Sequence, residues 1–550
     1  MKEPKLGPSV QPHIIQTAAE EDATAPNGDL DATTPYLHGA RLHVITATLC
    51  LCLFLTNLEI PIVTTSLVSI TTELGGLNKI SWISTAYMLG YAGVLVLAAK
   101  FSDIFGRKSC LLLGVGLFIV FSAACGAAQT MEQLIIFRAF QGLGGAGNYS
   151  LCTIIVLEMV PPEKYAKYTG LISVVFVFSL LLGPLFGGAI TQHSTWRWVF
   201  FLNVPPGVIA AVLLILFLPN NFPHHNKPRV SAGLDLTGSL RKSFLRVDIL
   251  GATLLLAATL LLVTALDEAN EQYVWRSAFT ITLLVVSGTL WVIFVAWERR
   301  VTRSTGSREP VFPWRFFQNR VWIAMLLNAV FLGMIWFVTM FELPQRFEMV
   351  NQLSPLHAAI RFIPFTVAAP VGSILASTVA KMFKVPLLYL LGIGSLMQVV
   401  AYVLLGTVSG QHGISARQYG YQVLAGFACG INIPLLTLMT PYATEKRDHA
   451  VAMGAIAQLR VMGGCIGLAI ITTIHNSYLR SHLTQSLGAD VTEKVLQSTG
   501  VIATLPGGTQ DLIRGTYAAS YDLQMKVLAG LAGGQVLATM AMWQRNPIIV

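Results

Sequence analysis

Apolar residues form long runs along most of the chain, and short polar segments separate these runs. A helix that crosses the hydrocarbon core of a bilayer needs about 20 predominantly apolar residues. Runs of this length predict fourteen membrane-spanning helices, at residues 44–65, 81–99, 109–128, 133–157, 167–191, 198–218, 248–266, 277–297, 321–343, 356–380, 386–407, 419–440, 449–475 and 524–543. The pattern therefore predicts an all-α polytopic membrane protein.

The two ends of the chain lack such runs. Residues 1–43 contain acidic residues such as Glu20, Glu21 and Asp22 together with several prolines, and no apolar stretch that resembles a signal peptide. We expect this segment to be a disordered cytoplasmic N-terminal tail. Residues 544–550 are expected to form a cytoplasmic C-terminus.

Composition narrows the class of protein. Hydrophobic residues make up 54% of the 550 residues and charged residues only 11%, whereas soluble domains carry roughly 25% charged residues. This excludes a soluble multidomain enzyme, a disordered protein and a nucleic-acid-binding protein. The seven cysteines lie in apolar runs, so no disulfide framework is expected.

The net charge of +9 alone would suggest a polyanionic partner, but the positions of the cations are better explained by membrane topology. With the N-terminus in the cytoplasm, 24 of the 36 Lys and Arg residues fall on the cytoplasmic side and 10 on the other side. Cytoplasmic loops keep such a positive excess. The charge therefore predicts topology, with both termini cytoplasmic and no nucleic acid as a partner.

Two long basic loops, 219–247 and 298–320, organise the chain. They divide it into six spans within 44–218, an inserted pair of spans within 219–320 (about 248–266 and 277–297), and six spans within 321–543. Two six-helix bundles with a site near the midplane between them are typical of secondary transporters. Residues 476–523 are expected to be the longest extracytoplasmic loop, with short amphipathic helices that cover the outer face.

The loop between the second and third spans carries Asp103, Gly106, Arg107 and Lys108. A positive-inside signal accounts for Arg107 and Lys108 but not for Asp103 and Gly106 at these offsets. The segment resembles the signature loop of the major facilitator superfamily, Gly-x-Leu-Ala-Asp-x-x-Gly-Arg-Lys, with Ala99 where the family has Gly. The resemblance implies that this loop is a conformational latch between the two bundles on the cytoplasmic side, in one state of the transport cycle.

Span four contains Arg138, Gln141 and Gly142, which resemble the Arg-x-x-Gln-Gly motif of the same superfamily. An arginine at the centre of a membrane helix costs about 2.5–3.5 kcal/mol or more unless it faces a cavity or a partner. The alternative is that Arg138 extends to the lipid headgroups at the outer interface.

Span five ends with Gly183, Pro184, Gly187 and Gly188. The proline kinks a helix, and the glycines allow bending and close packing. The spacing resembles the Gly-Pro-x-x-Gly-Gly motif of the antiporter branch of the superfamily. That resemblance favours export over uptake.

Span one contains Glu59, and its surroundings resemble the fourteen-span drug:proton antiporter family, which reads Leu-Asp-x-Thr-Ile-Val-Asn-x-Ala-Leu there. This chain departs from the pattern at Glu59, Pro61, Thr64 and Ser66. The resemblance implies that Glu59 couples transport to protons, assisted by Arg138. A structural ion pair or a water-facing glutamate is the alternative.

The C-terminal half offers fewer motifs. Arg460 lies within a span that has no carboxylate, so three interpretations stay open: it attracts an anionic substrate, it pairs with Glu59 across the halves, or it is structural. Residues 343–347 and 354–355 resemble a loop of fungal members. By helical position, the residues expected to face a substrate cavity are Asn57, Gln141, Asn328, Trp336, Asn432, Gln458 and Arg460.

These features together predict a fungal-type secondary active exporter of drugs, toxins or a secondary metabolite, driven by proton antiport. No Gly-x-x-x-x-Gly-Lys-Ser/Thr loop is present and the eleven histidines show no metal-ligand spacing, so neither ATP, a metal nor another cofactor is expected.

The expected partners are the bilayer, the small-molecule substrate and protons. The protein is expected to be a monomer in the plasma membrane, with the vacuolar membrane as the alternative. A proton-coupled uptake symporter, for example of metal chelates, and a non-transport membrane protein are the competing functions.

Overall fold

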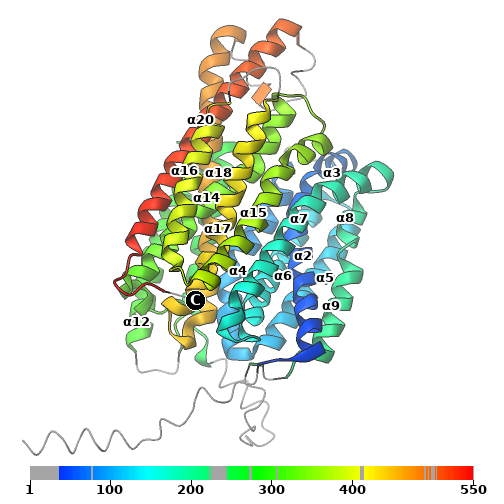
Figure 1. The fold of residues 1–550 in the computed structure, drawn as a ribbon. Coiled ribbons are helices and arrows are strands. Elements are labelled where there is room, and N and C mark those ends of the chain that lie inside the picture. The colour runs from blue at the N-terminus through cyan, green and yellow to red at the C-terminus, as the bar shows by residue number, and fades with distance from the viewer. Residues whose placement is uncertain are drawn as a thin grey trace, which may run out of the picture.

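A computed structural model describes residues 36–548 except 76–78, 221, 224–244, 272–274, 305–307, 409–413, 489–490, 493–494, 497–501 and 503–504. Within these residues the chain is helical, and an isolated bridge between Val247 and Glu309 is the one β pairing. Long helices stand side by side as an elongated bundle (Figure 1). The expected fold class, an all-helical membrane protein, is confirmed.

The first half of the bundle is built around six long helices. They are α2 (Gly39–Thr64), α4 (Ile80–Phe105), α5 (Arg107–Ala127), α6 (Met131–Glu158), α7 (Tyr165–His193) and α9 (Val204–Phe217), with short helices α3 (Leu67–Leu74) and α8 (Arg197–Phe201) between them. Most of the predicted tail lies outside the described residues, but its last part is ordered. The Leu37 amide donates to the carbonyl of Met159, and α2 begins at Gly39 rather than at residue 44.

An inserted pair of helices and a second half follow. The inserted helices are α11 (Ile249–Glu271) and α12 (Ala278–Arg303), and the short α13 (Arg315–Gln318) leads into the second half. The second half consists of α14 (Arg320–Met349), α15 (Pro355–Phe383), α16 (Leu387–Leu405), α17 (Ala416–Ala443), α18 (His449–Leu487) and α20 (Gly507–Ala541).

Within the described ranges, twelve helices are long and apolar enough to cross a membrane. Helices α6 and α20 are not among them, although both are long. Polar residues such as Arg138 in α6 and Asp511 and Arg514 in α20 lower their mean hydropathy.

The same packing occurs in both halves: α4 packs on α6 as α15 packs on α17, and α2 packs on α7 as α14 packs on α18. Glycines make these approaches possible. A Cβ atom on Gly142 would lie 2.2 Å from the carbonyl oxygen of Tyr87, and one on Gly430 would lie 1.8 Å from that of Ala369. Each half is therefore one copy of a repeated helical arrangement.

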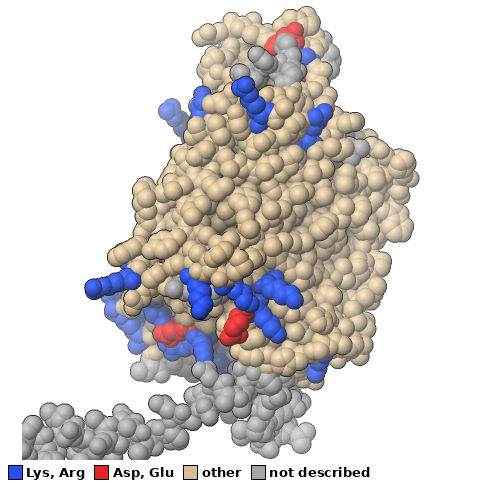
Figure 2. Space-filling view, in the orientation of Figure 1, with Lys and Arg blue, Asp and Glu red and all other residues tan. Residues whose placement is uncertain are grey.

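The outer surface explains how the bundle sits in a bilayer. Figure 2 shows a broad band of uncharged surface, with Lys and Arg gathered toward the two ends. Apolar side chains on the lipid side are exposed, including Val292 of α12 (71% exposed) and Leu216 of α9 (66%). Such a continuous apolar surface is stable against lipid and not against water.

The segment 476–523 is helical near both of its ends, and these helices continue the flanking spans instead of being separate short helices. Helix α18 continues to Leu487 and α20 begins at Gly507, so both helices project beyond the bundle at the top of Figure 1. Leu479 and Leu483 of α18 pack against Ile513 and Tyr517 of α20. These apolar residues are too few and too widely spaced to indicate a membrane span, so the sequence predicted short amphipathic helices in a loop and not extensions of the two long helices.

Candidate functional site

A central cavity of about 770 Å³ lies between the two halves. Its wall is formed by α2, α3, α4, α6, α7, α11, α14, α15, α17 and α18. Aliphatic and aromatic side chains form most of the lining, with polar side chains among them. The aromatic residues are Tyr91, Tyr149, Phe176, Trp336, Phe337, Phe341 and Phe362, and the polar ones include Asn57, Thr85 and Ser173. An apolar pocket with few polar groups is the usual form of a small-molecule site.

The cavity is closed at the end of the bundle where α4 meets α5. There a Cβ atom on Gly454 of α18 would lie 3.1 Å from the Cβ of Ala99, so the two halves touch closely. The Lys381 ammonium of α15 also donates to the carbonyl of Glu163 at 3.1 Å. In the other direction the lining continues to Thr65 and to exposed Gln345. The cavity thus extends toward the end of the bundle where α2 ends.

Glu59 and Arg138 form a buried ion pair behind the cavity wall. The Arg138 Nη1 lies 2.5 Å from Glu59 Oε1, and the two side chains are 1% and 0% exposed. Asn203 donates to the other carboxylate oxygen of Glu59 at 2.6 Å. Arg138 does not extend to the headgroups, and Glu59 does not face water. In this conformation the two side chains are an ion pair, and neither the headgroup interpretation of Arg138 nor the water-facing interpretation of Glu59 applies.

Arg138 also has partners that do not depend on the charge of Glu59. Its guanidinium donates to Gln141 Oε1 at 2.8 Å and to the carbonyl of Ile83 at 2.9 Å, and it lies 4.5 Å from the centre of the Tyr87 ring. A guanidinium over an aromatic face is favourable in a desolvated site. Protonation of Glu59 would therefore leave Arg138 with three other neutral contacts.

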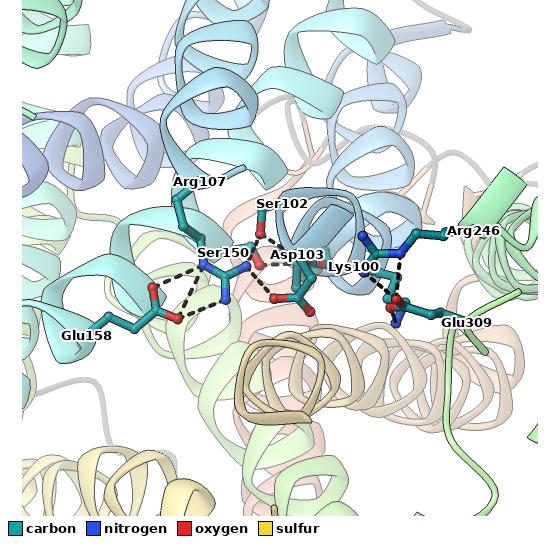
Figure 3. Close-up of polar contacts among 10 residues, drawn as sticks. Lys100, Ser102, Asp103, Arg107, Ser150, Glu158, Arg246 and Glu309 are labelled. Carbon is teal, nitrogen blue, oxygen red and sulfur yellow. Dashed lines mark hydrogen bonds and ion pairs between the residues drawn. The ribbon is translucent and has the colours of Figure 1, made fainter. Parts of the chain in front are cut away.

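The signature loop forms a second ion-pair network (Figure 3). Arg107 lies between two carboxylates, 2.6 Å from Asp103 Oδ1 and 2.8 Å from Glu158 Oε1, and it donates to the Ser102 hydroxyl at 2.5 Å. Lys108 donates to the carbonyls of Ile215 and Leu218, where α9 ends. A cation at that position stabilises a helix C-terminus.

In this conformation the contacts of the loop lie within the first half, and the latch between the halves stays a prediction for one state of the transport cycle. Asp103, Arg107 and Lys108 bind residues of the first half, and no ion pair of theirs with the second half occurs among the described residues. The physical reason is that Glu158, at the end of neighbouring α6, lies near enough to pair with Arg107. What lies at the contact between the halves is Ala99, the position where this chain departs from the family signature.

Lys100 reaches outside the first half and was not singled out from the sequence. Its ammonium lies 2.8 Å from Glu309, which precedes α13, and Arg246 pairs with the same carboxylate (Figure 3). Burial raises the pKa of Glu309, but the hydrogen bonds and charges of Lys100 and Arg246 outweigh it and hold the pKa below its ordinary value of 4.5. The contact thus joins α4 to the segments that flank the inserted helices.

We expect Glu309→Gln to loosen this end of the bundle. A partly exposed ion pair contributes up to about 1 kcal/mol, which corresponds to a change of up to about fivefold in a two-state population. The measurement is the maleimide labelling rate of a cysteine placed at Ala99, which is buried in this conformation. An Arg308→Gln variant serves as the control for charge in the same segment.

The pH dependence of that labelling follows from the lowered pKa of Glu309. A carboxylate with a depressed pKa stabilises the structure above its ordinary value and loses this effect as the pH falls through the depressed value. Maleimide reacts with the thiolate, so the labelling rate of the Ala99→Cys protein is divided by that of free cysteine at the same pH. The rate corrected in this way should be constant between pH 8 and pH 5.5. A rise of the rate within that range would contradict the assignment.

Gly106 joins α4 to α5 with φ +95°, a conformation that side chains rarely adopt. We expect Gly106→Ala to lower the free energy of unfolding by about 1–3 kcal/mol, through backbone strain alone, because no atom lies within 4 Å of the added Cβ. Thermal unfolding in detergent measures this effect. Gly116→Ala is the matched control, since Gly116 is helical and its Cβ would also meet open space; an equal loss in both variants would rule out strain.

The span-five motif packs α7 against α2, the helix that carries Glu59. A Cβ atom on Gly183 would lie 2.5 Å from Pro61 Cγ, and one on Gly187 would lie 2.0 Å from Thr65 Oγ1. Pro184 lines the cavity, whereas a Cβ on Gly188 would meet no atom within 4 Å. Gly183 and Gly187 are thus needed for close packing on α2, and Pro184 is part of the cavity wall.

The predicted cavity residues divide into two groups. Asn57, Trp336 and Arg460 line the cavity. Gln141, Asn328, Asn432 and Gln458 do not, because they hydrogen-bond to residues of other helices, namely Ser122, Thr539, Gln398 and Thr259. A buried amide satisfies its polar atoms wherever a neighbouring helix offers a partner, and helical position alone does not reveal that choice.

Arg460 does not pair with Glu59. Its guanidinium donates to the Tyr149 hydroxyl at 2.5 Å, across the boundary between the halves. The sequence reasoning also missed the two acidic residues of the lining, Asp267 of α11 and Glu348 of α14. Asp267 directly follows the apolar run 248–266, so its position at the end of a predicted span could have marked it as a candidate cavity residue.

Comparison with known proteins agrees with this architecture. The chain is 40% identical over 512 residues to the MFS-type transporter FPY5 of Fusarium mangiferae, covering 93% of this chain and 85% of that protein. It is 27% identical over 507 residues to the MFS-type efflux pump LUC4 of a Fusarium species, covering 92% and 85%. A bacterial homologue of the human lysosomal transporter Spinster has the same fold, with a TM-score of 0.58 at 16% identity, covering 93% of this chain and 100% of that one.

The family model described as Major Facilitator Superfamily matches residues 48–468. That range includes the ion pair, the signature loop and most of the cavity wall. The protein is thus a multi-pass integral membrane transporter, and the chain belongs to the major facilitator superfamily.

Proposed function

We propose that this protein is a secondary active exporter of amphipathic small molecules, driven by exchange with protons through alternating access. It has fourteen spans, with α6 and α20 added to the twelve apolar helices, and both termini lie in the cytoplasm. It works as a monomer without ATP or a bound cofactor. The plasma membrane is its location, with the vacuolar membrane as the alternative.

The ion pair between Glu59 and Arg138 is the observation that carries the proposal. It joins α2 to α6 next to the cavity, and Asn57 and Ile60, which flank Glu59 in α2, line the cavity itself. A carboxylate that is held by one cation can lose that interaction on protonation, so its charge can be linked to the arrangement of the helices around the site. Proton binding and substrate binding then compete through α2.

The chemistry of the cavity supports the substrate class. Aromatic and aliphatic side chains form most of its wall, with hydroxyl and amide groups interspersed. Such a wall binds molecules that combine an apolar body with a few polar groups. Drugs, toxins and secondary metabolites share this character.

Direction and orientation rest on independent features. Relatives named efflux pumps, such as LUC4, and the resemblance of Gly183–Gly188 to the antiporter motif favour export. Lys and Arg are present at both ends of the bundle but are denser at the end where α2 begins (Figure 2), which favours a cytoplasmic N-terminus. The cavity then extends toward the outside in this conformation.

The experiment uses inside-out membrane vesicles that contain the protein and an acidic interior. An amphipathic fluorescent dye should accumulate inside, and a protonophore should abolish the accumulation. Accumulation that survives the protonophore would contradict proton coupling. Accumulation only in right-side-out vesicles with an inward proton gradient would establish uptake by symport instead.

A further inference from the structure

The inserted helix α11 is part of the cavity wall rather than an addition outside it. It packs against α4 of the first half and α18 of the second half. Val263, Leu266 and Asp267 are spaced three and four positions apart, so they share one face of the helix, and all three line the cavity. The inserted helices therefore contribute side chains to the site.

Asp267 brings a carboxylate to this wall without a cation beside it. The Thr85 hydroxyl of α4 donates to Asp267 Oδ2 at 2.5 Å. Neither an ion pair of Asp267 nor a hydrogen bond to its Oδ1 occurs among the described residues. A desolvated carboxylate without a counterion is costly, and a cation in the cavity would remove that cost.

The other charges of the lining leave the cavity acidic. Asp267 and Glu348 are its carboxylates, and Arg460 is its one cation among the described residues. Arg460 is directed to the Tyr149 hydroxyl. The rings of Tyr91 and Trp336 also line the cavity, and aromatic faces attract cations in desolvated sites.

We propose that Asp267 is a specificity-determining residue that recognises the cationic group of the substrate. The substrate class is an amphipathic molecule that carries a protonated amine or another organic cation on an aromatic or aliphatic body. Thr85 positions the carboxylate through Oδ2 and leaves Oδ1 for the ligand. This inference rests on the exporter proposed above for its transport role, but the binding site itself is testable without transport.

The test measures equilibrium binding of two probes to the purified full-length protein in detergent. The probes are ethidium, an aromatic cation, and Nile red, an uncharged dye, and fluorescence anisotropy gives the Kd of each. We expect Asp267→Asn to raise the Kd of ethidium at least tenfold and to change that of Nile red less than twofold. Thr85→Val, which keeps the charge, should raise the Kd of ethidium by a smaller factor.

Glu268→Gln is the matched control. Glu268 is the adjacent acid on the same helix, and it is buried and does not line the cavity. This variant removes the same charge at nearly the same place and should leave the Kd of ethidium unchanged. Asp267→Glu, which keeps the carboxylate, should retain binding, and the unchanged Kd of Nile red shows that each variant is folded.

Three results would overturn the inference: no binding of ethidium by the parent protein, an unchanged Kd in Asp267→Asn, or an equal loss for both probes. Failure of the proposed function has a different signature. In that case ethidium binds and the binding depends on Asp267, but vesicles do not accumulate it in response to a proton gradient. The two failures are therefore distinguishable.

Discussion

Glu59→Gln is expected to abolish transport driven by a proton gradient while leaving a folded protein. Glutamine has nearly the same shape, and its oxygen can still accept from Arg138, but it cannot release a proton. Its amide nitrogen can donate to Asn203 Oδ1, which has no partner in the parent protein, once the Asn203 amide rotates. Vesicles with this variant should show gradient-driven accumulation reduced to background. Exchange of labelled for unlabelled substrate without a gradient should continue, because that process needs no proton.

The same variant tests whether the neutral form of Glu59 is compatible with the fold. Glutamine imitates the protonated acid, and Arg138 keeps its contacts with Gln141, Ile83 and Tyr87. A monodisperse elution profile in size-exclusion chromatography is therefore expected. Full gradient-driven transport by Glu59→Gln would remove Glu59 from the mechanism, and a variant that cannot fold would show that the protonated state is not part of the cycle.

Arg138→Met is expected to have the largest effect on stability. Removal of one partner from a buried ion pair typically costs about 3–5 kcal/mol, because the other charge stays buried without compensation. Both Glu59 and Arg138 are fully buried here. Thermal unfolding in detergent, followed by tryptophan fluorescence, should show a strongly lowered midpoint.

A double-mutant cycle separates the ion pair from other effects of the substitution. Combining Arg138→Met with Glu59→Gln removes both charges, so the midpoint should recover much of the loss. Lys79→Met is the surface control: its ammonium lies at the same distance of 2.5 Å from Glu132, but both side chains are largely exposed. Such a pair should shift the midpoint little. Additive losses in the cycle would mean that Glu59 and Arg138 do not interact.

Much of the architecture is encoded locally. A run of about 20 apolar residues has few alternatives to a membrane helix, so the sequence predicts most of the long helices. At residues 476–523 the sequence does not reveal that α18 and α20 extend past the bundle. Their extensions are stabilised by contact with each other, and a pairing between distant segments leaves no periodic signal in either one alone.

The candidate site was only partly predictable. Glu59, Arg138 and Arg460 attract attention because a charge within an apolar run is unusual. Their partners depend on which helices meet: α2 and α6 bring Glu59 to Arg138, although 79 positions separate them, and α18 meets α6 so that Arg460 reaches Tyr149. Position along a helix does not determine such partners.

The sequence by itself determined that this chain is a polytopic membrane protein with two helical halves and an inserted pair, because the cost of polar groups in lipid acts on each segment separately. Only the tertiary structure decided which charges pair, which side chains form the cavity, and that α11 completes its wall with Asp267. The physical reason is that these properties depend on close packing between segments far apart in the chain, where glycines set how near two helices come and a neighbouring side chain decides which polar group is satisfied.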